Sequence, residues 1–512
     1  MITLDSFKEL IVVLAIAATI FHLAKPVALQ FMGAEDFARR RLLWFALTIV
    51  AFMVTSLWLF ALAAVPLYLW AGRKDSNPVA LYLLMMQVVP AVWVDIPFLG
   101  NNGLFPLDNY RMLALAVLLP VAIRYRRNSG DAVPGTFGAM DVLLLIFGAL
   151  QVALYTPPDL RSHLVIPDSP TNALRRAFLF LLDVYLLYFV LSRTCQSRRK
   201  MQDAMATLCL ACAVMAAIAI FEHARGWLLY VGIASRWGDP TAGFYLLRAG
   251  AVRAQASAGH SISLGCLLAV AFGFWLYLQS QVRSAMRRIG AVLLLWGGLF
   301  AAFSRGALLG AAAVYFAFMA AGPRALSRLA RGAFVALALG GLLALTPIGE
   351  RVLDELPTAG QAADPYRERL AERGWQLVFA HPYFGDQFPW PEMEDLRQGE
   401  GIIDIVNTYL GTALSYGLVG LFVFVSFMLL ATTRTYSRSR ELAVADPDLA
   451  LLGTSLVASI LGLLLMISTS SFILACQKMF YVLAGLATAY AQLASARLHE
   501  PVAPTAVAPL RE

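Results

Sequence analysis

Residues 449–468, LALLGTSLVASILGLLLMIS, contain no charged side chain. A helix of about 20 such residues crosses the hydrocarbon core of a bilayer, which is about 30 Å thick. Similar stretches recur along the whole 512-residue chain, in which 60% of the residues are hydrophobic and 14% are charged. Closed β-barrels also span membranes, but their strands lack runs of this length. We therefore predict an all-α fold, a polytopic transmembrane helical bundle with one large, partly helical loop.

The apolar stretches predict roughly 12–14 spans, the lower number applying if short neighbouring stretches merge or form a re-entrant pair. They lie near residues 9–28, 42–70, 79–98, 111–123, 139–155, 177–191, 204–222, 258–278, 289–303, 306–321, 333–348, 405–431, 449–468 and 472–494. We expect the chain to divide into N-terminal transmembrane helices (1–135), a central core with an outer arginine-bearing loop (136–348), a loop forming a cap (349–404), C-terminal helices (405–498) and a disordered tail (499–512).

The distribution of arginine predicts the orientation of these spans, because cytoplasmic loops carry an excess of Lys and Arg. From residue 124 onward every second loop is basic, and we expect these loops and the N-terminus in the cytoplasm. Their arginines and lysine are Arg124, Arg126, Arg127, Arg193, Arg198, Arg199, Lys200, Arg283, Arg287, Arg288, Arg324, Arg328, Arg331, Arg434, Arg438 and Arg440. Arg39, Arg40 and Arg41 disagree with this scheme, unless the first stretch lies in the interface or residues 42–70 make two passes.

The outer loop 349–404 is unlike the others, with twelve acidic residues against five arginines. Within it, Tyr366 to Phe379 places Leu370, Trp375 and Leu377 among charged residues. This pattern is compatible with a short amphipathic helix, which His381-Pro382 would end. We expect a helical cap over the outer mouth of the bundle.

Several function classes lack support. The net charge is +8, but the basic residues are scattered through short loops, which argues against a nucleic-acid partner. The motifs HExxH, the Walker loop and GxSxG are absent, and the five cysteines imply neither a disulfide framework nor a metal site. We predict no metal and no cofactor.

Arginines in the outer loop 223–257 break the orientation rule. They are Arg225, Arg236, Arg248 and Arg253. A guanidinium group offers a planar fork of donors that suits phosphate, so an anionic ligand would explain them. Anchoring to lipid headgroups is the alternative for Arg225 and Arg236, whereas we favour function for Arg248 and Arg253.

Other polar residues lie at or within the predicted spans. Arg305 of Ser304-Arg305-Gly306 falls between two closely spaced spans, where its partner would be an acid or a ligand pyrophosphate unless its side chain reaches the interface. His260 begins a span and is either a helix cap or a base. Asp183, two turns from Arg175 and Arg176, is interpreted as a structural counter-ion.

The stretch 401–420, GIIDIVNTYLGTALSYGLVG, enters the membrane carrying three polar residues of interest. Asp404 is a candidate base, and Asn407 and Tyr409 are candidate positioning groups. The alternative for Asp404 is helix N-capping, because it lies just before the expected helix.

Four motifs in this order resemble the O-antigen ligase and O-antigen polymerase superfamily over roughly residues 240–430. They are RAQASAGHSISLG (253–265), FSRGALLG (303–310), HPYFG (381–385) and NTYLGTALSYGLVG (407–420). The resemblance implies a multi-pass protein of the bacterial inner membrane that transfers glycosyl groups at the periplasmic face. It also implies an undecaprenyl-diphosphate-linked glycan as donor, with no nucleotide sugar and no required metal.

Carried over residue by residue, Arg253 and Arg305 resemble the two family arginines that hold the donor diphosphate. Ligases usually carry a histidine before the Asn of the last motif, whereas this chain has Val406, so Asp404 becomes the substitute base beside Asn407. The chain thus looks more like an exopolysaccharide or O-antigen polymerase, whose acceptor is a second lipid-linked repeat unit. The further substrate-binding candidates are Arg248, His260, Ser304, Arg367, Arg369 and Tyr409.

Two alternatives remain open. A ligase would transfer finished polysaccharide to lipid A core or another acceptor, and a transporter would move lipid-linked oligosaccharide without chemistry. Transporters tend to show repeated halves, which we do not find. Besides membrane lipids, a polymerase would have a flippase and a chain-length regulator as candidate partners.

Overall fold

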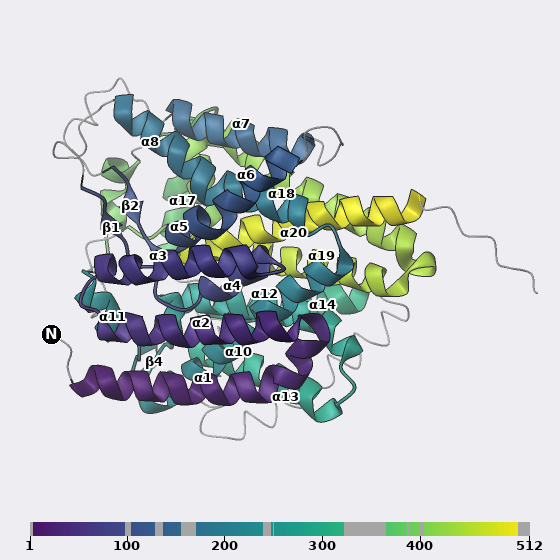
Figure 1. Cartoon of the computed structure of the whole chain (residues 1–512). Coiled ribbons are helices and arrows are strands. Elements are labelled where there is room, and N and C mark those ends of the chain that lie inside the picture. The colour runs from purple at the N-terminus through teal and green to yellow at the C-terminus, as the bar shows by residue number, and fades with distance from the viewer. Residues whose placement is uncertain are drawn as a thin grey trace, which may run out of the picture.

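The computed structural model describes residues 4–97, 104–128, 137–154, 170–238, 247–248, 250–321, 365–386, 389–398 and 403–499. Helices dominate this part of the chain and run back and forth roughly parallel to one another (Figure 1). Seven of them are long and apolar enough to cross a membrane: Leu4–Phe31 (α1), Arg198–Arg225 (α10), Ser261–Gln281 (α12 with a short 3-10 turn), Ala285–Ala302 (α13), Thr408–Ala445 (α18), Pro447–Ile467 (α19) and Leu474–His499 (α20). Ala139–Leu154 (α7) and Arg305–Ala320 (α14) are shorter apolar helices. The prediction of an all-α, multi-pass membrane protein is confirmed.

The first correction concerns residues 42–70, where the single predicted span is wrong and the alternative of two passes holds. The structure has two helices there, α2 (Ala34–Met53) and α3 (Leu57–Lys74), because the Ser56 side chain accepts a hydrogen bond from Leu59 N and starts a new helix. A hydropathy window does not register such a break inside an apolar run. The additional pass resolves the conflict over Arg39–Arg41, since the start of α2 now lies at the same end of the bundle as the end of α3. Leu4, at the start of α1, lies at the opposite end of the bundle from these basic residues (Figure 1). This contradicts the prediction that the N-terminus lies on the same side as the basic loops.

The second correction concerns residues 79–98, predicted as a full span. The helix α4 covers only Pro78–Met85, and its residues from Val79 onward are buried. The chain leaves helical geometry before Pro90, which has no backbone N–H to donate. It then forms a two-residue strand, Val94–Asp95 (β1), that pairs with Pro106–Leu107 (β2). The predicted span 333–348 lies outside the described residues.

Two helical passes contain a π-helical segment. One pass comprises α5 (Asn109–Leu113), η1 (Ala114–Leu118) and α6 (Leu119–Asn128), and the other α8 (Pro170–Phe180), η3 (Leu181–Tyr185) and α9 (Leu186–Thr194). Asp183 of η3 is a counter-ion as predicted, but its partners are Arg111 at 2.7 Å and Lys478 at 3.1 Å. The expected partners bond elsewhere, since Arg176 donates to the Tyr416 hydroxyl and Arg175 lies 3.9 Å from Asp95.

Ion pairs fasten the end of the bundle that carries the basic connections, here named the basic end. Arg40 at the start of α2 is 1% exposed and pairs with Asp75 and Asp203, each at 2.6 Å. Arg198 at the start of α10 pairs with Asp446 in the turn between α18 and α19. These contacts join helices that are far apart in sequence.

The acidic loop contributes a small helical layer at the opposite end of the bundle. The amphipathic helix expected at Tyr366–Phe379 is confirmed as α17 (Pro365–Ala380), which a short 3-10 helix, η6 (Trp390–Leu396), follows. The buried side chains of Leu370, Leu377 and Val378 pack with Leu410 and Leu414 of α18. The described part of the loop therefore covers the first turns of α18.

Candidate functional site

The C-terminal turn of α10 organises the loop that carries Arg253. Glu222 is fully buried, and its carboxylate accepts hydrogen bonds from the backbone N–H groups of Leu229 (2.9 Å), Gln255 (3.0 Å) and Ala256 (2.8 Å). Ala256 has a positive φ of 45°, a conformation that side chains seldom adopt and that these bonds hold in place. Glu222 thus fixes the backbone immediately after Arg253.

Two further contacts bring the Arg253 segment to the turn that precedes Arg305. His223 Nδ1 lies 2.8 Å from the Val252 carbonyl oxygen, and its ring lies 5.9 Å from the Phe303 ring. On the other side of Arg253, Ala254 N donates to the carbonyl of Ala301 at 3.0 Å. The two predicted diphosphate-binding arginines, Arg253 and Arg305, therefore stand on neighbouring segments.

His260 lies where α12 begins, and its role as a helix cap is confirmed. Its Nδ1 accepts a hydrogen bond from Ile262 N at 3.1 Å, which assigns the remaining proton of the neutral ring to Nε2. Burial lowers the pKa of His260 to about 4, the charge of Arg253 lowers it as well, and Asp404 acts in the opposite direction. The side chains of Arg253, His260 and Asp404, predicted from separate motifs, are therefore close enough to interact electrostatically.

Asp404 is held by the turn between α19 and α20. Its Oδ1 accepts a hydrogen bond from the Ser471 hydroxyl at 2.6 Å, and its backbone N–H donates to the Tyr366 hydroxyl of α17. The alternative in which Asp404 caps the next helix is wrong, because Asn407 is the N-cap of α18 and accepts from Tyr409 N and Leu410 N. The Asp404 carboxylate is thus not used for capping.

The same turn, residues 468–473, contacts several segments of the site. The Thr408 hydroxyl donates to the Ser470 carbonyl at 3.0 Å, and the Ser263 hydroxyl of α12 donates to the Ile473 carbonyl at 3.4 Å. A Cβ atom on Gly306, next to Arg305, would lie 2.7 Å from Thr469 Oγ1. The starts of α12, α14 and α18 therefore meet at this turn, and the predicted residues Arg305, His260 and Asp404 lie at or next to those starts.

Ser304 and Arg305 differ in exposure although they are neighbours. Ser304 is the N-cap residue of α14 and is 5% exposed, whereas Arg305, the first residue of the helix, is exposed. Phe303 before them has a φ of 49°, so the chain reverses sharply between α13 and α14. An arginine at the first position of a helix adds its charge to the positive end of the helix dipole, which favours an anion there.

The HPYFG motif docks into a break in α18. Gly417 interrupts the helix with φ 65°, and the backbone N–H groups of Leu418 and Val419 donate to the carbonyls of Pro382 and Tyr383. In return, Asp386 N donates to the Leu414 carbonyl at 2.7 Å. A Cβ atom on Gly385 or Gly417 would lie 2.2 Å from a backbone oxygen of the other segment. This docking explains why two motifs distant in sequence both require glycine.

The other candidates have structural contacts or exposed positions. The Tyr409 hydroxyl donates to the Leu464 carbonyl at 3.0 Å, so this donor is used within the bundle. Arg367 and Arg369 lie on the exposed side of α17, and Arg248 lies in strand β3 (Leu247–Arg248), which pairs with β4 (Ala251–Val252). Arg236 donates to Ser6 Oγ and the Phe52 carbonyl, which ties α11 (Val231–Arg236) to α1 and α2. Among the described residues no group of three or more His, Cys, Asp or Glu side chains is placed to hold a metal ion.

A cavity of about 130 Å³ lies beside His260 and is also lined by Glu222, Trp93, Tyr230 and Gln255. Sequence reasoning missed Glu222 and the turn at 468–473. Glu222 carries a visible signal, since it is an acidic residue at the end of an apolar span. The polar run Ser468-Thr469-Ser470-Ser471 between two spans is a weaker signal.

The fold defines a multi-pass membrane protein in which several of the predicted polar residues lie together at one end of the bundle. Residues 289–425, about a quarter of the chain, match the family model described as O-antigen ligase (Wzy_C). This match supports assignment of the chain to an O-antigen ligase or polymerase-like superfamily, a glycosyl-transferring kind of enzyme that acts on lipid-linked glycans. No curated protein matches the chain.

Proposed function

We propose that this protein is a polymerase that joins undecaprenyl-diphosphate-linked oligosaccharide repeat units into exopolysaccharide or O-antigen. The observation that carries the proposal is that the segments bearing His260, Arg305 and Asp404 meet at the turn 468–473, at the end of the bundle opposite the basic end. Under the positive-inside rule the basic end is cytoplasmic, so the site would face the periplasm of a bacterial inner membrane.

In the proposed reaction the acceptor hydroxyl attacks the anomeric carbon of the donor sugar. The bond from that carbon to the diphosphate oxygen breaks, and the undecaprenyl diphosphate leaves with both bonding electrons. Arg253 and Arg305 stabilise the negative charge on the departing diphosphate. Asp404, oriented by Ser471, takes the proton of the acceptor hydroxyl. His260 caps α12 in its neutral form, and α17 and η6 would shape the surface that the glycan contacts.

The test uses purified full-length protein in membranes with one synthetic lipid-diphosphate repeat unit, with and without lipid A core. A ladder formed from the repeat unit alone would establish a polymerase. Product formed only when the core is added would establish a ligase, the second candidate, and would refute our preferred function. Movement of the intact repeat unit across the membrane without any new glycosidic bond would identify a transporter.

Variants assign the roles of the residues. Arg305→Ala and Arg253→Ala should each lower polymer formation about 100-fold or more, by analogy with the loss of one group that stabilises a developing charge. Arg283→Ala, an exposed arginine at the basic end, is the matched control and should retain full activity. Polymer at the wild-type level in a well-expressed Arg305→Ala variant would refute the proposed role of Arg305.

A further inference from the structure

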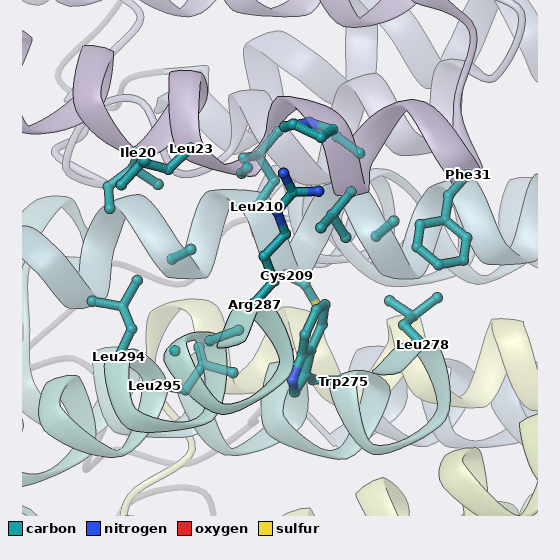
Figure 2. Close-up of a pocket in the computed structure, with 18 of the residues that line it drawn as sticks. Ile20, Leu23, Phe31, Cys209, Leu210, Trp275, Leu278, Arg287, Leu294 and Leu295 are labelled. Atoms are coloured by element: carbon teal, nitrogen blue, oxygen red, sulfur yellow. The ribbon is translucent and has the colours of Figure 1, made fainter. Parts of the chain in front are cut away.

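An apolar groove of about 630 Å³ opens on the side of the bundle, far from the site described above. Its walls are the second half of α1, from Ile20 to Phe31, and the first half of α13, from Met286 to Leu295. Its floor is formed by α10, where Cys209 and Leu210 lie, and by Trp275 and Leu278 of α12 (Figure 2). It occupies the half of the bundle nearer the basic end.

The rim of this groove is apolar and open. Leu23 on α1 is 62% exposed and Met286 on α13 is 83% exposed, so lipid reaches the groove from the side. The floor is made partly of small residues, Ala206, Cys209 and Ala213. Small floor residues between two larger walls leave room for a hydrocarbon chain rather than for another helix.

One cationic side chain projects into this apolar space. Arg287 rises from α13 toward α1 in the middle of the groove (Figure 2). Within the described ranges Arg287 makes no ion pair, and none of the residues lining the groove is acidic. A guanidinium group in an apolar groove at the membrane boundary is stabilised by a neighbouring anion. A phosphate group matches the geometry of its N–H donors.

The length of the groove matches one leaflet. From Arg287 to Leu295 the helix rises about 12 Å, and half of the hydrocarbon core measures about 15 Å. Beyond Leu295, α13 closes against α10, because a Cβ on Gly298 would lie only 2.8 Å from Ala216 Cα. The groove therefore suits an acyl chain of one leaflet rather than a polyprenyl chain that extends across the membrane.

We propose that this groove binds an anionic phospholipid of the leaflet on the basic side, with its phosphate at Arg287 and an acyl chain between α1 and α13. The proposal rests on the membrane fold and on the groove, and is independent of the reaction proposed above.

The test measures lipid retention by native mass spectrometry on the detergent-purified full-length protein, with phosphatidylglycerol or phosphatidylcholine of identical chains. The wild type should retain phosphatidylglycerol about five-fold better, as one arginine near a headgroup predicts. Arg287→Gln should abolish this preference, and Arg283→Gln, an exposed arginine outside the groove, should keep it.

A second pair of variants tests the groove itself. A Cβ at Gly290 meets nothing within 4 Å, so Gly290→Phe can fill the groove without a clash and should reduce retention of both lipids. Ile289→Phe, at an exposed neighbouring position outside the groove, should leave retention unchanged. Equal retention of the two lipids by the wild type, or unchanged retention by Gly290→Phe, would overturn the proposal. Displacement of phosphatidylglycerol by polyprenyl phosphate would assign the groove to the carrier lipid and would also overturn it.

Discussion

The two ends of the bundle use acidic residues differently. At the basic end, Asp75 and Asp203 form ion pairs with the buried guanidinium of Arg40 and so join three separate segments. At the opposite end, Glu222 accepts three backbone N–H groups and Asp404 accepts the Ser471 hydroxyl. Asp75 and Asp203 therefore join helices directly, whereas Glu222 shapes the loop that carries Arg253 and Asp404 joins the segment before α18 to the turn at 468–473. The first arrangement serves stability, and the second fixes the backbone beside the residues proposed to bind the donor diphosphate.

The largest expected effect tests the basic end. Arg40→Ala removes the cation between Asp75 and Asp203 and leaves two buried carboxylates, which should cost about 3–5 kcal/mol of stability. Thermal unfolding of the detergent-solubilised protein measures this loss. Arg438→Ala is the control, because the ion pair of Arg438 with Glu441 one turn away is exposed to solvent, so its loss should cost about 1 kcal/mol or less. Equal stability of Arg40→Ala and the wild type would refute the role of these ion pairs in stabilising the bundle.

The next effect tests how the cap is attached at the opposite end. Gly417→Ala imposes a side chain on a residue with φ 65° and puts its Cβ 2.2 Å from the Tyr383 carbonyl oxygen. Strain and overlap together should cost about 2–4 kcal/mol and should release the HPYFG segment. Limited proteolysis near residues 382–386 should then become faster. Gly411→Ala is the control, since its Cβ would come no closer than 3.4 Å to another residue, and resistance of both variants to protease would contradict the docking.

Sequence predicted the parts of this molecule that depend on local pattern. Apolar length identified the long helices, and the alternation of charged and apolar residues identified α17. The errors arose where a short polar break or a distant partner decides the structure. Ser56 starts a helix inside an apolar run, and Asp183 finds Arg111 and Lys478, which lie 72 and 295 positions away. Hydropathy averaged over a window does not register a helix start at a single serine. It also carries no information about ion pairs between residues far apart in sequence.

In the candidate site, too, local pattern predicted individual residues but not the contacts between distant segments. Arg253, His260 and Asp404 were identified from motifs, because each interrupts an apolar or glycine-rich context at the edge of a span. Their mutual interaction, and the supporting roles of Glu222 and Ser471, depend on contacts between segments far apart in sequence. No single-sequence pattern specifies such contacts.

A moderate effect tests the use of Glu222 as a support for the backbone. Glu222→Gln keeps the size of the side chain but turns an –NH₂ group toward backbone donors, which should cost about 1–3 kcal/mol. Because the loop of Arg253 loosens, polymer formation should fall more than the loss of folded protein explains. Activity per folded molecule, measured alongside thermal unfolding, separates the two effects. Glu441→Gln, which alters a carboxylate exposed at the basic end, is the control and should change neither quantity.

The smallest effect at neutral pH concerns His260. Asn is a good N-cap, so His260→Asn should change stability at pH 7 by less than about 0.5 kcal/mol, whereas His260→Ala should cost about 1 kcal/mol. If His260 were instead the base of the reaction, His260→Asn would abolish polymer formation while leaving the protein folded. Polymer formation that persists in His260→Asn would support Asp404 as the base.

The acid side of the stability profile gives an independent check on His260. Its pKa is about 4 in the folded protein, against an ordinary value of 6.5, because burial and Arg253 oppose protonation while Asp404 only partly compensates. The unfolded chain therefore binds more protons between these two values, and folding stability should decrease as the pH falls from about 6.5 toward 4. The His260→Asn variant lacks this group, so its stability should decrease less over the same interval. Unfolding measured at pH 7 and pH 5 for both proteins compares the two slopes, and parallel slopes would mean that His260 is accessible to protons in the folded state.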